Sequence, residues 1–261
     1  MFDINSFLYT SAILLVIAIV LWISSRVKND VAIVDSFWSL MILAAGLCFF
    51  LSADNISGRS MVVITLLSIW AIRLSAHITW RNWGKEEDVR YQTIRANNQP
   101  NFEFKSLYIV FLLQAFLALL VALPMMSIFN AESSWTQLDT LASALWLFGM
   151  LFESVSDYQL ARFKSSAVNQ GKVMDKGLWR FSRHPNYFGE FCIWWAFFLF
   201  AVSSGYWWSI LSPLLMSILL LKVSGVSLLE STIAHRRPEY AKYIETTSAF
   251  FPWFPKRNQQ A

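Results

Sequence analysis

The sequence predicts an all-α protein: a polytopic bundle of seven transmembrane helices, with the N-terminus outside and the C-terminus in the cytoplasm. Of its 261 residues, 56% are hydrophobic and 15% are charged, and the mean hydropathy is +0.45. A soluble domain carries about 25% charged residues and about 45–50% apolar ones. The apolar runs are continuous rather than alternating, which favours helices over the strands of a barrel. This composition excludes an ordinary soluble globule and a disordered chain.

Seven apolar stretches are long enough to be read as membrane spans, for which about 20 residues are needed. The first is not expected to be a signal peptide, because Asp3 precedes it and no small-residue cleavage site follows. The sixth and seventh are separated only by the polar turn Ser203-Ser204-Gly205. The predicted spans are, in order, Phe7–Ser24, Val31–Leu51, Met61–Trp80, Leu107–Phe129, Leu138–Ala161, Tyr187–Val202 and Tyr206–Leu229.

The lysines and arginines predict how these spans are oriented. The segments after spans one, three, five and seven hold 18 of the 21 basic residues, whereas the alternate segments hold only Arg59. The other two, Arg73 and Lys222, lie inside spans. Since cytoplasmic loops carry the excess of Lys and Arg, the predicted C-terminus is cytoplasmic. The pI of about 9.1 therefore reflects membrane orientation, and no nucleic-acid partner is expected.

Several familiar sites are absent from the sequence. Cys48 and Cys192 both lie in apolar runs, so no disulfide framework and no metal site are expected. The chain has no GxGxxG, no GxxxxGK[ST] and no HExxH motif. These absences exclude a soluble-type nucleotide-binding domain and a zincin-type protease, so any nucleotide must bind to the membrane helices and their cytoplasmic loops.

Acidic residues in the predicted spans point to a functional site, because an ionisable group in the bilayer costs a few kcal/mol. All but Glu153 lie near cytoplasmic ends, where the basic residues cluster, and Glu153 and Asp157 share one helical face. Pairing with Arg73, Lys164 or Lys222 is the structural alternative. Asp35 is expected about one turn inside its span, because Asn29 and Asp30 suit the helix cap better. The five acids are Asp35, Glu153, Asp157, Glu190 and Glu230.

The segment before the sixth span has the composition of an anion site. Arg180, Arg183 and His184 precede a helix predicted to begin at about Pro185, and arginines at a helix N-terminus suit phosphates. Neighbouring aromatic rings could cover a flat ring system, and Glu190 could accept hydrogen bonds from an amide. The alternative is a belt of Arg, Trp and Tyr at headgroup level. That belt explains Trp179 and Arg180, but not an acid one turn into the membrane.

The string Arg183-His184-Pro185-Asn186-Tyr187-Phe188-Gly189-Glu190 resembles the signature of the steroid 5α-reductase C-terminal family of membrane reductases, and is similar to that of the sterol C14 reductases. A shorter Arg-His-Pro core is shared with isoprenylcysteine carboxyl methyltransferases. The resemblance covers roughly Leu141 to Pro255 and is greatest with the family's bacterial branch of unknown function. The N-terminal half is similar to that branch through Asn29-Asp30, Val34-Asp35, Trp38 and Glu87-Asp88-Val89-Arg90-Tyr91.

This resemblance implies two functional halves. Residues 1–135, with four helices, would form the substrate half, and residues 136–261, with three, the NADPH-binding half. Asp157 matches the acid of the family's Ser-Asp-Tyr stretch, and Lys164 falls where the family has a phosphate-contacting Arg. Asn186 and Glu190 match the residues that hold the nicotinamide end. The implied cofactor site comprises Glu153, Asp157, Arg162, Lys164, Lys172, Arg180, Arg183, His184, Asn186, Tyr187, Glu190, Glu230, His235, Arg236, Tyr240 and Tyr243.

The expected activity is NADPH-dependent reduction of a C=C bond in an apolar enone or steroid-like lipid from the bilayer of a bacterial cytoplasmic membrane. Asp35, Tyr91 and Glu190 are the candidate catalytic residues, with His77 as a further candidate proton donor. The sequence departs from the steroid enzymes, because span two has no Gln-Glu pair and Trp70 stands where they have Tyr. The alternative is an S-adenosylmethionine-dependent methyltransferase of a lipid or isoprenyl substrate. A transporter is disfavoured, since its polar groups would lie near mid-membrane.

Overall fold

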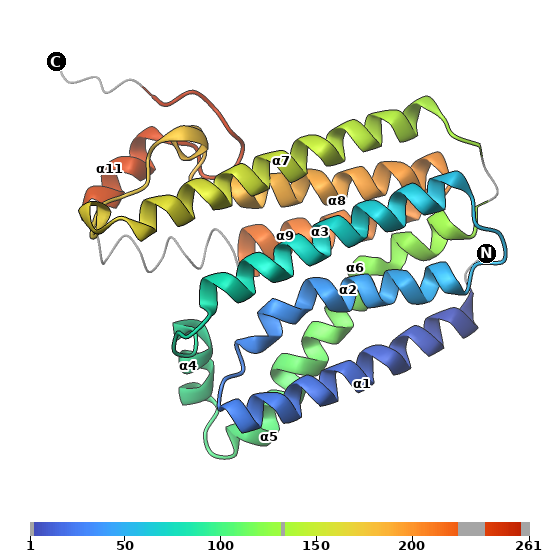
Figure 1. Cartoon of the computed structure of the whole chain (residues 1–261), viewed down its shortest axis with the longest axis horizontal. Coiled ribbons are helices and arrows are strands. Elements are labelled where there is room, and N and C mark those ends of the chain that lie inside the picture. The colour runs from blue at the N-terminus through green and yellow to red at the C-terminus, as the bar shows by residue number, and fades with distance from the viewer. Residues whose placement is uncertain (1–2, 132–133, 224–237, 257–261) are drawn as a thin grey trace. The chain divides into compact units, whose positions relative to one another are not determined.

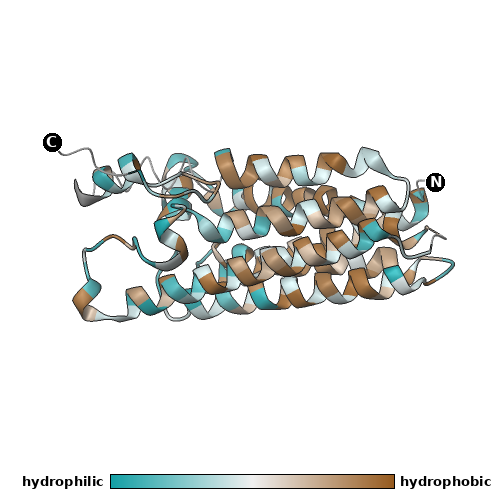
Figure 2. Cartoon of the chain, turned by 90° about the horizontal axis from the view of Figure 1, so that it is seen from above, coloured by the Kyte–Doolittle hydropathy of each residue, from teal (hydrophilic) through white to brown (hydrophobic). Residues whose placement is uncertain are grey.

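The computed structural model describes residues 3–131, 134–223 and 238–256, and every regular element in these ranges is helical. Five helices are long and apolar enough to cross a membrane, which confirms a multi-pass membrane protein. They correspond to the first five predicted spans, except that the second helix begins two residues later than predicted, and are Ile4–Lys28, Ile33–Leu51, Gly58–Asn82, Phe102–Phe129 and Gln137–Ser165. Figure 2 shows apolar residues over the middle of the long helices and hydrophilic ones mostly toward their ends.

The chain divides into two compact units, one of residues 1–136 and 200–212, the other of residues 137–199 and 213–261. The first break lies one residue from the predicted boundary, but residues 200–212 group with the first unit rather than the second. In the first unit, α1 (Ile4–Lys28), α2 (Ile33–Leu51) and α6 (Leu113–Phe129) pack together, and α3 (Gly58–Asn82) packs on α2. A π-helical turn, Leu107–Leu112, joins the short α5 (Phe102–Ser106) to α6.

The polar segment between α3 and α5 forms a short helix, α4 (Val89–Asn97), which the sequence did not predict (Figure 1). Asp88 caps it by accepting a hydrogen bond from the backbone N–H of Arg90 at 2.9 Å. An Asp at this position satisfies one of the free N–H groups of a helix start. The cap fixes where α4 begins, and hence which of its residues face the rest of the first unit.

Arg59 is enclosed rather than exposed at the other end of the first unit, with 2% of its surface accessible. Its guanidinium donates to the Ser134 carbonyl at 2.7 Å and to the hydroxyls of Ser204 and Ser203 at 3.1 and 3.2 Å. A buried charge needs such hydrogen bonds to offset its desolvation. Arg59 therefore binds three segments of this unit together, a role that its isolated position in the sequence did not reveal.

In the second unit, α7 (Gln137–Ser165) and α8 (Pro185–Ser203) approach each other through two glycines. A Cβ atom on Gly149 would lie 2.6 Å from the Gly189 carbonyl oxygen, and one on Gly189 would lie 2.6 Å from the backbone nitrogen of Glu153. Only glycine permits this approach of two backbones. The glycine of the Arg-His-Pro string thus has a packing role.

The last two predicted spans are only partly matched. The α8 helix covers the sixth, but its first turns carry Asn186 and Glu190, and it is not among the five long apolar helices. The seventh begins with a 3₁₀ turn, Trp207–Ile210, and continues through α9 (Leu211–Ile218) and a π-helical turn, Leu219–Val223. Residues 224–229 of this span lie outside the described residues. Seven spans and their orientation therefore stay predictions.

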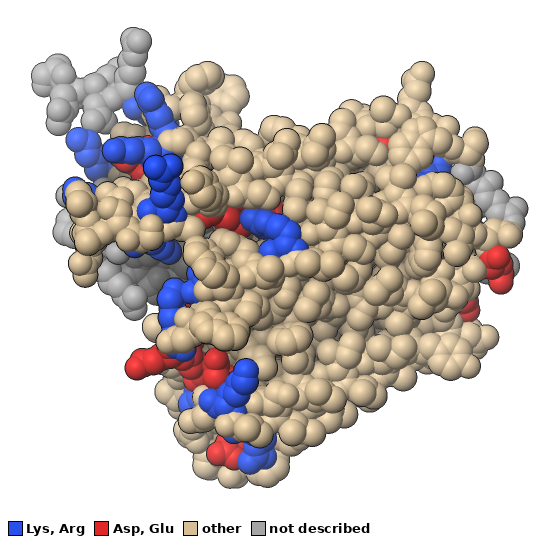
Figure 3. Space-filling model, in the orientation of Figure 1, with Lys and Arg blue, Asp and Glu red and all other residues tan. Residues whose placement is uncertain are grey.

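Charged side chains gather at particular ends of the helices. Figure 3 shows them over α4 and α5 in the first unit, and over α11 (Pro238–Thr246) and the segment before α8 in the second. The remaining surface in this view is mostly tan, as expected where long helices face lipid. These charged ends belong to the segments that the sequence predicts to be cytoplasmic loops.

Candidate functional site

The first polar cluster is built on Asp35, at the start of α2. The helix begins at Ile33, so Asp35 lies in its first turn rather than one full turn inside, which corrects the prediction. It is not the helix cap: the cap position is Ala32, whose own N–H donates to Asp30 Oδ1 at 2.8 Å. Asp35 is therefore left for contacts with another element.

Those contacts come from α4, which is 55 and 56 residues further along the chain. The Tyr91 hydroxyl donates to Asp35 Oδ1 at 2.6 Å, and Arg90 Nη2 donates to Asp35 Oδ2 at 2.8 Å. Arg90 Nε also donates to Asp88 Oδ1 at 2.9 Å. Each oxygen of Asp35 thus has one donor, and Tyr91 is only 6% exposed. The structure brings together two of the three candidate catalytic residues, Asp35 and Tyr91.

The electrostatics of this cluster keep the phenol protonated. Burial and the negative charge of Asp35 raise the pKa of Tyr91 well above its usual value. Burial alone would raise the pKa of Asp88, but hydrogen bonds from Arg90 outweigh it and hold that pKa below its usual value. The Gln114 side chain, from α6, also interacts with the Tyr91 hydroxyl. Sequence analysis missed Gln114, although it is a lone amide near the start of an uncharged span.

A second pair of charges explains why α4 meets α2 at this position. Glu87 accepts two hydrogen bonds from Arg95, at 2.8 and 2.9 Å, and one from the backbone N–H of Val31 at 2.8 Å. A two-point Arg–carboxylate pair fixes direction as well as distance. Because Val31 precedes α2, this contact ties α4 to the start of α2 and so sets Tyr91 beside Asp35.

The second cluster lies where α7 and α8 approach each other closely in the second unit. Glu153, Asp157 and Glu190 are 2%, 6% and 8% exposed. Glu153 and Asp157 lie on one face of α7 as predicted, and the Gly149–Gly189 approach brings the Glu153 backbone against α8. Buried carboxylates cost free energy unless they are hydrogen-bonded or paired. Together with Asp139, which is 0% exposed near the other end of α7, they give the second unit four buried carboxylates among the described residues.

The Arg-His-Pro turn enters α8 as predicted, with the helix beginning at Pro185. Arg183, however, is only 7% exposed and its Nη1 donates to the backbone carbonyls of Ile244 and Thr247, at 2.9 and 2.6 Å. These carbonyls belong to the end of α11, where a helix leaves its acceptors unpaired. Arg183 therefore has a structural role, and its predicted contact with a phosphate stays a prediction.

Other predicted site residues also hold this turn in place. His184 is 4% exposed and its ring stacks on Tyr187, with centroids 5.6 Å apart and planes 3° apart. The Tyr243 hydroxyl donates to the Trp179 carbonyl, and Trp179 Nε1 donates to the Ser156 carbonyl at 3.0 Å. Tyr240 packs edge-on against Tyr243. The turn is thus hydrogen-bonded to α7 on one side and to α11 on the other.

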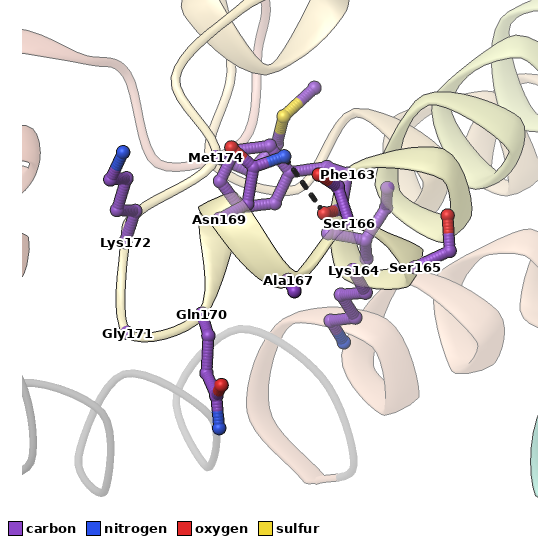
Figure 4. Close-up of a pocket in the computed structure, with 11 residues that line it drawn as sticks. Phe163, Lys164, Ser165, Ser166, Ala167, Asn169, Gln170, Gly171, Lys172 and Met174 are labelled. Atoms are coloured by element: carbon purple, nitrogen blue, oxygen red, sulfur yellow. Dashed lines mark hydrogen bonds between the residues drawn. The ribbon is translucent and has the colours of Figure 1, made fainter.

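The predicted cofactor-site residues Arg162, Lys164, Lys172 and Arg180 are exposed. Lys164 and Lys172 line a pocket of about 460 Å³ formed by the end of α7 and the loop that follows it. Figure 4 shows their side chains extending in different directions, and Asn169 donating to the Phe163 carbonyl at 3.0 Å. Glu230, His235 and Arg236 lie outside the described residues. The structure therefore buries the acids Glu153, Asp157 and Glu190 in the second unit and places Lys164 and Lys172 at one exposed pocket.

Comparison with known proteins gives the family. The family model described as "Protein of unknown function (DUF1295)" matches residues 21–247. The chain belongs to this family. An uncharacterized protein of Schizosaccharomyces pombe (strain 972) is 26% identical over 282 aligned residues, which cover 96% of this chain and 81% of that protein. No solved structure matches the chain.

The DUF1295 match spans both polar clusters, since residues 21–247 include Asp35, Tyr91 and the Arg-His-Pro turn. It confirms the part of the predicted resemblance that points to a family of unknown function. Membership of the steroid 5α-reductase superfamily stays a prediction.

Proposed function

We propose that this DUF1295 protein is a membrane-embedded oxidoreductase that uses NADPH to reduce a C=C bond conjugated to a carbonyl in an apolar, bilayer-dissolved substrate. The observation that carries the proposal is the Tyr91–Asp35 pair: a buried phenol that keeps its proton, beside a carboxylate, at the end of apolar helices. It is supported by the resemblance of the Arg-His-Pro string to that of the membrane reductases. Steroids and related lipids are the substrate class that this resemblance suggests.

The residues of the second unit fit the cofactor in their chemistry. Buried Asp157 and Glu190 offer carboxylate acceptors, and Asn186 an amide, which suit the hydroxyl and carboxamide groups of a nicotinamide riboside. The exposed Lys164 and Lys172 suit phosphates, whose charge they would meet at the aqueous end. When bound, NADPH would supply the hydride, and the protein would supply position and a dry site.

Residues of the first unit would provide a hydrogen-bond donor to the substrate carbonyl oxygen. Because Tyr91 keeps its proton at neutral pH, its O–H can turn from Asp35 toward a substrate carbonyl oxygen. A hydrogen bond there stabilises the enolate oxygen that develops as the β-carbon is reduced, as an oxyanion site does. Asp35 and Gln114 would orient the hydroxyl, and the hydrogen bond from Arg90 would hold the Asp35 side chain in position.

We also propose the finer topology: seven spans, an outside N-terminus and a cytoplasmic C-terminus, in the cytoplasmic membrane of a bacterium. The 18-to-1 division of the basic residues supports this orientation. The clustering of charged side chains around α4, α5 and α11 is consistent with it.

The proposal is tested by single-turnover oxidation of NADPH with a panel of apolar enones, using protein purified in detergent. We expect Tyr91→Phe to bind NADPH normally but to slow turnover by about 10²–10³-fold, the range for loss of one donor to a developing oxyanion. The matched control is Tyr108→Phe, because Tyr108 is 57% exposed and lies outside both clusters. If the wild-type protein binds S-adenosylmethionine but not NADPH, the result contradicts the reductase proposal and favours a methyltransferase. Equal turnover rates for Tyr91→Phe and Tyr108→Phe would show that Tyr91 has no role in the reaction.

A further inference from the structure

The segment after α11 exposes three large aromatic side chains close together. Phe251, Trp253 and Phe254 are 60%, 73% and 78% exposed. The backbone of this segment is nevertheless held: the Trp253 N–H donates to the Phe181 carbonyl at 2.9 Å, and the Lys256 N–H to the Thr246 carbonyl at 2.9 Å. Single exposed apolar residues are common, but a contiguous patch marks an interaction site. Here the patch is presented by a fixed backbone.

The patch continues onto the helices of the second unit. Phe250 and Phe251 pack edge-on against Phe188 and Phe191 of α8, with ring centroids 5.6 to 5.9 Å apart. Phe188 packs in turn against Phe152 of α7 at 5.5 Å. Such edge-to-face pairs stabilise the cluster beyond the area that they bury. One aromatic surface therefore links the C-terminal segment to two helices.

The α7 helix also carries an exposed apolar face of the kind that contacts lipid. Leu147, Leu151, Val155 and Tyr158 are 42–62% exposed and recur every three or four residues, along one side of a helix long and apolar enough to cross a membrane. Tyr158 lies toward the carboxyl end of this face. Aromatic residues of this kind concentrate where the hydrocarbon region meets the headgroups. The aromatic cluster of the C-terminal segment reaches α7 at Phe152, which lies between Leu151 and Val155 in the sequence.

Basic side chains accompany the patch. Lys176, Arg180 and Lys256 are exposed, and Figure 3 shows blue side chains gathered over this part of the second unit. Juxtamembrane Lys and Arg are attracted to anionic lipids. Aromatic rings with adjacent cations match a headgroup boundary, which offers apolar chains on one side and phosphates on the other.

We infer that residues 250–256 form a membrane-interface anchor. Phe251, Trp253 and Phe254 insert at the headgroup–acyl boundary of the leaflet nearer the carboxyl end of α7. The partner is the surface of an anionic lipid bilayer. The anchor also bears on the Arg-His-Pro turn, because Ser182 Oγ donates to the Phe250 carbonyl at 2.8 Å and Arg183 to the Thr247 carbonyl at 2.6 Å. Lipid contact at the patch thereby holds residues 182–184 in place. This inference does not depend on the proposed reaction.

The test places a fluorophore on the anchor of the full-length protein. Trp253→Cys is labelled with bimane and reconstituted in vesicles of phosphatidylcholine and phosphatidylglycerol, and quenching is measured with iodide in the water and with lipids spin-labelled near the headgroup or near the chain end. The wild-type chain, labelled in parallel, gives the background from Cys48 and Cys192. Matched controls are Lys172→Cys, in an exposed loop, and Leu151→Cys, on the lipid-facing side of α7.

We expect headgroup-labelled lipid to quench the Trp253→Cys probe about twofold or more above the Lys172→Cys probe, as for groups 5–10 Å into the boundary. Iodide should quench the Lys172→Cys probe more strongly than the Trp253→Cys probe. If Trp253→Cys fails to fold, Phe251→Cys gives the same test. Quenching by iodide alone would overturn the inference, because the patch would then face water. Protection from both iodide and lipid would also overturn it and would instead indicate protein, such as a second copy of the chain, over the patch.

Discussion

Replacing Gly189 with alanine tests the close approach of α7 and α8. The new Cβ would lie 2.6 Å from the Glu153 backbone nitrogen, 2.7 Å from the Glu153 Cβ and 2.7 Å from the Gly149 carbonyl oxygen. Contacts between such atoms are normally about 3.5–4.0 Å, and two of the three atoms belong to backbone that cannot turn aside. The helices must therefore separate, at an overpacking cost of about 1–3 kcal/mol. For a chain of this size the Tm should fall by roughly 2–12 °C.

The assay is the Tm in detergent, followed by tryptophan fluorescence. Gly58→Ala is the matched control, because nothing lies within 4 Å of its new Cβ and the residue begins α3; its Tm should be unchanged or slightly higher. The Tm of Gly46→Ala should lie between those of Gly189→Ala and Gly58→Ala, since the nearest atom to its new Cβ is the end of the flexible Leu67 side chain. A Gly189→Ala protein as stable as Gly58→Ala would refute the close approach.

Further predictions concern the charged residues. Arg183→Ala should lower the free energy of unfolding by about 2–4 kcal/mol, because two carbonyls at the end of α11 lose a charged donor; an unchanged Tm with weaker NADPH binding would return Arg183 to the phosphate site. Glu190→Gln should keep NADPH affinity but slow hydride transfer roughly 10–100-fold, since the ring loses its fixed pose; single-turnover rates decide. The pKa of Asp88 is lowered in the folded state, so its stabilisation is present above about pH 4 and is lost as the pH falls through the folded pKa. Asp88→Asn should therefore flatten the acid dependence of the Tm. Reporter fusions should place residues 81–105 and the C-terminus in the cytoplasm, and a periplasmic C-terminus would contradict the topology.

The sequence was most informative where local chemistry decides the structure. Hydropathy located the five long helices, with the start of the second placed two residues too early, and Pro185 marked the start of α8, because proline suits the first turn. It was less informative at Asp35, whose distance from the helix start was overestimated. It missed α4, because a short polar helix has no apolar periodicity to reveal it and depends on its Asp88 cap and on contacts with α2.

Partners distant in the chain could not be predicted. Asp35 and Tyr91 were both candidates, but their contact depends on the Glu87–Arg95 pair, which is formed only in the folded chain. For Arg183, an arginine before a helix N-terminus suggested an anion, whereas its guanidinium is used by the carbonyls of α11. Both outcomes follow from the same need, that a buried charge must find hydrogen bonds wherever the fold supplies them.

The central claim is that the second unit binds a dinucleotide, and calorimetric titration of the purified protein tests it most directly. The protein should bind NADPH, with an affinity that weakens as salt screens the phosphate contacts. The proposal also predicts that it does not bind S-adenosylmethionine. Binding of S-adenosylmethionine without NADPH, or of neither in a folded protein, would contradict the account.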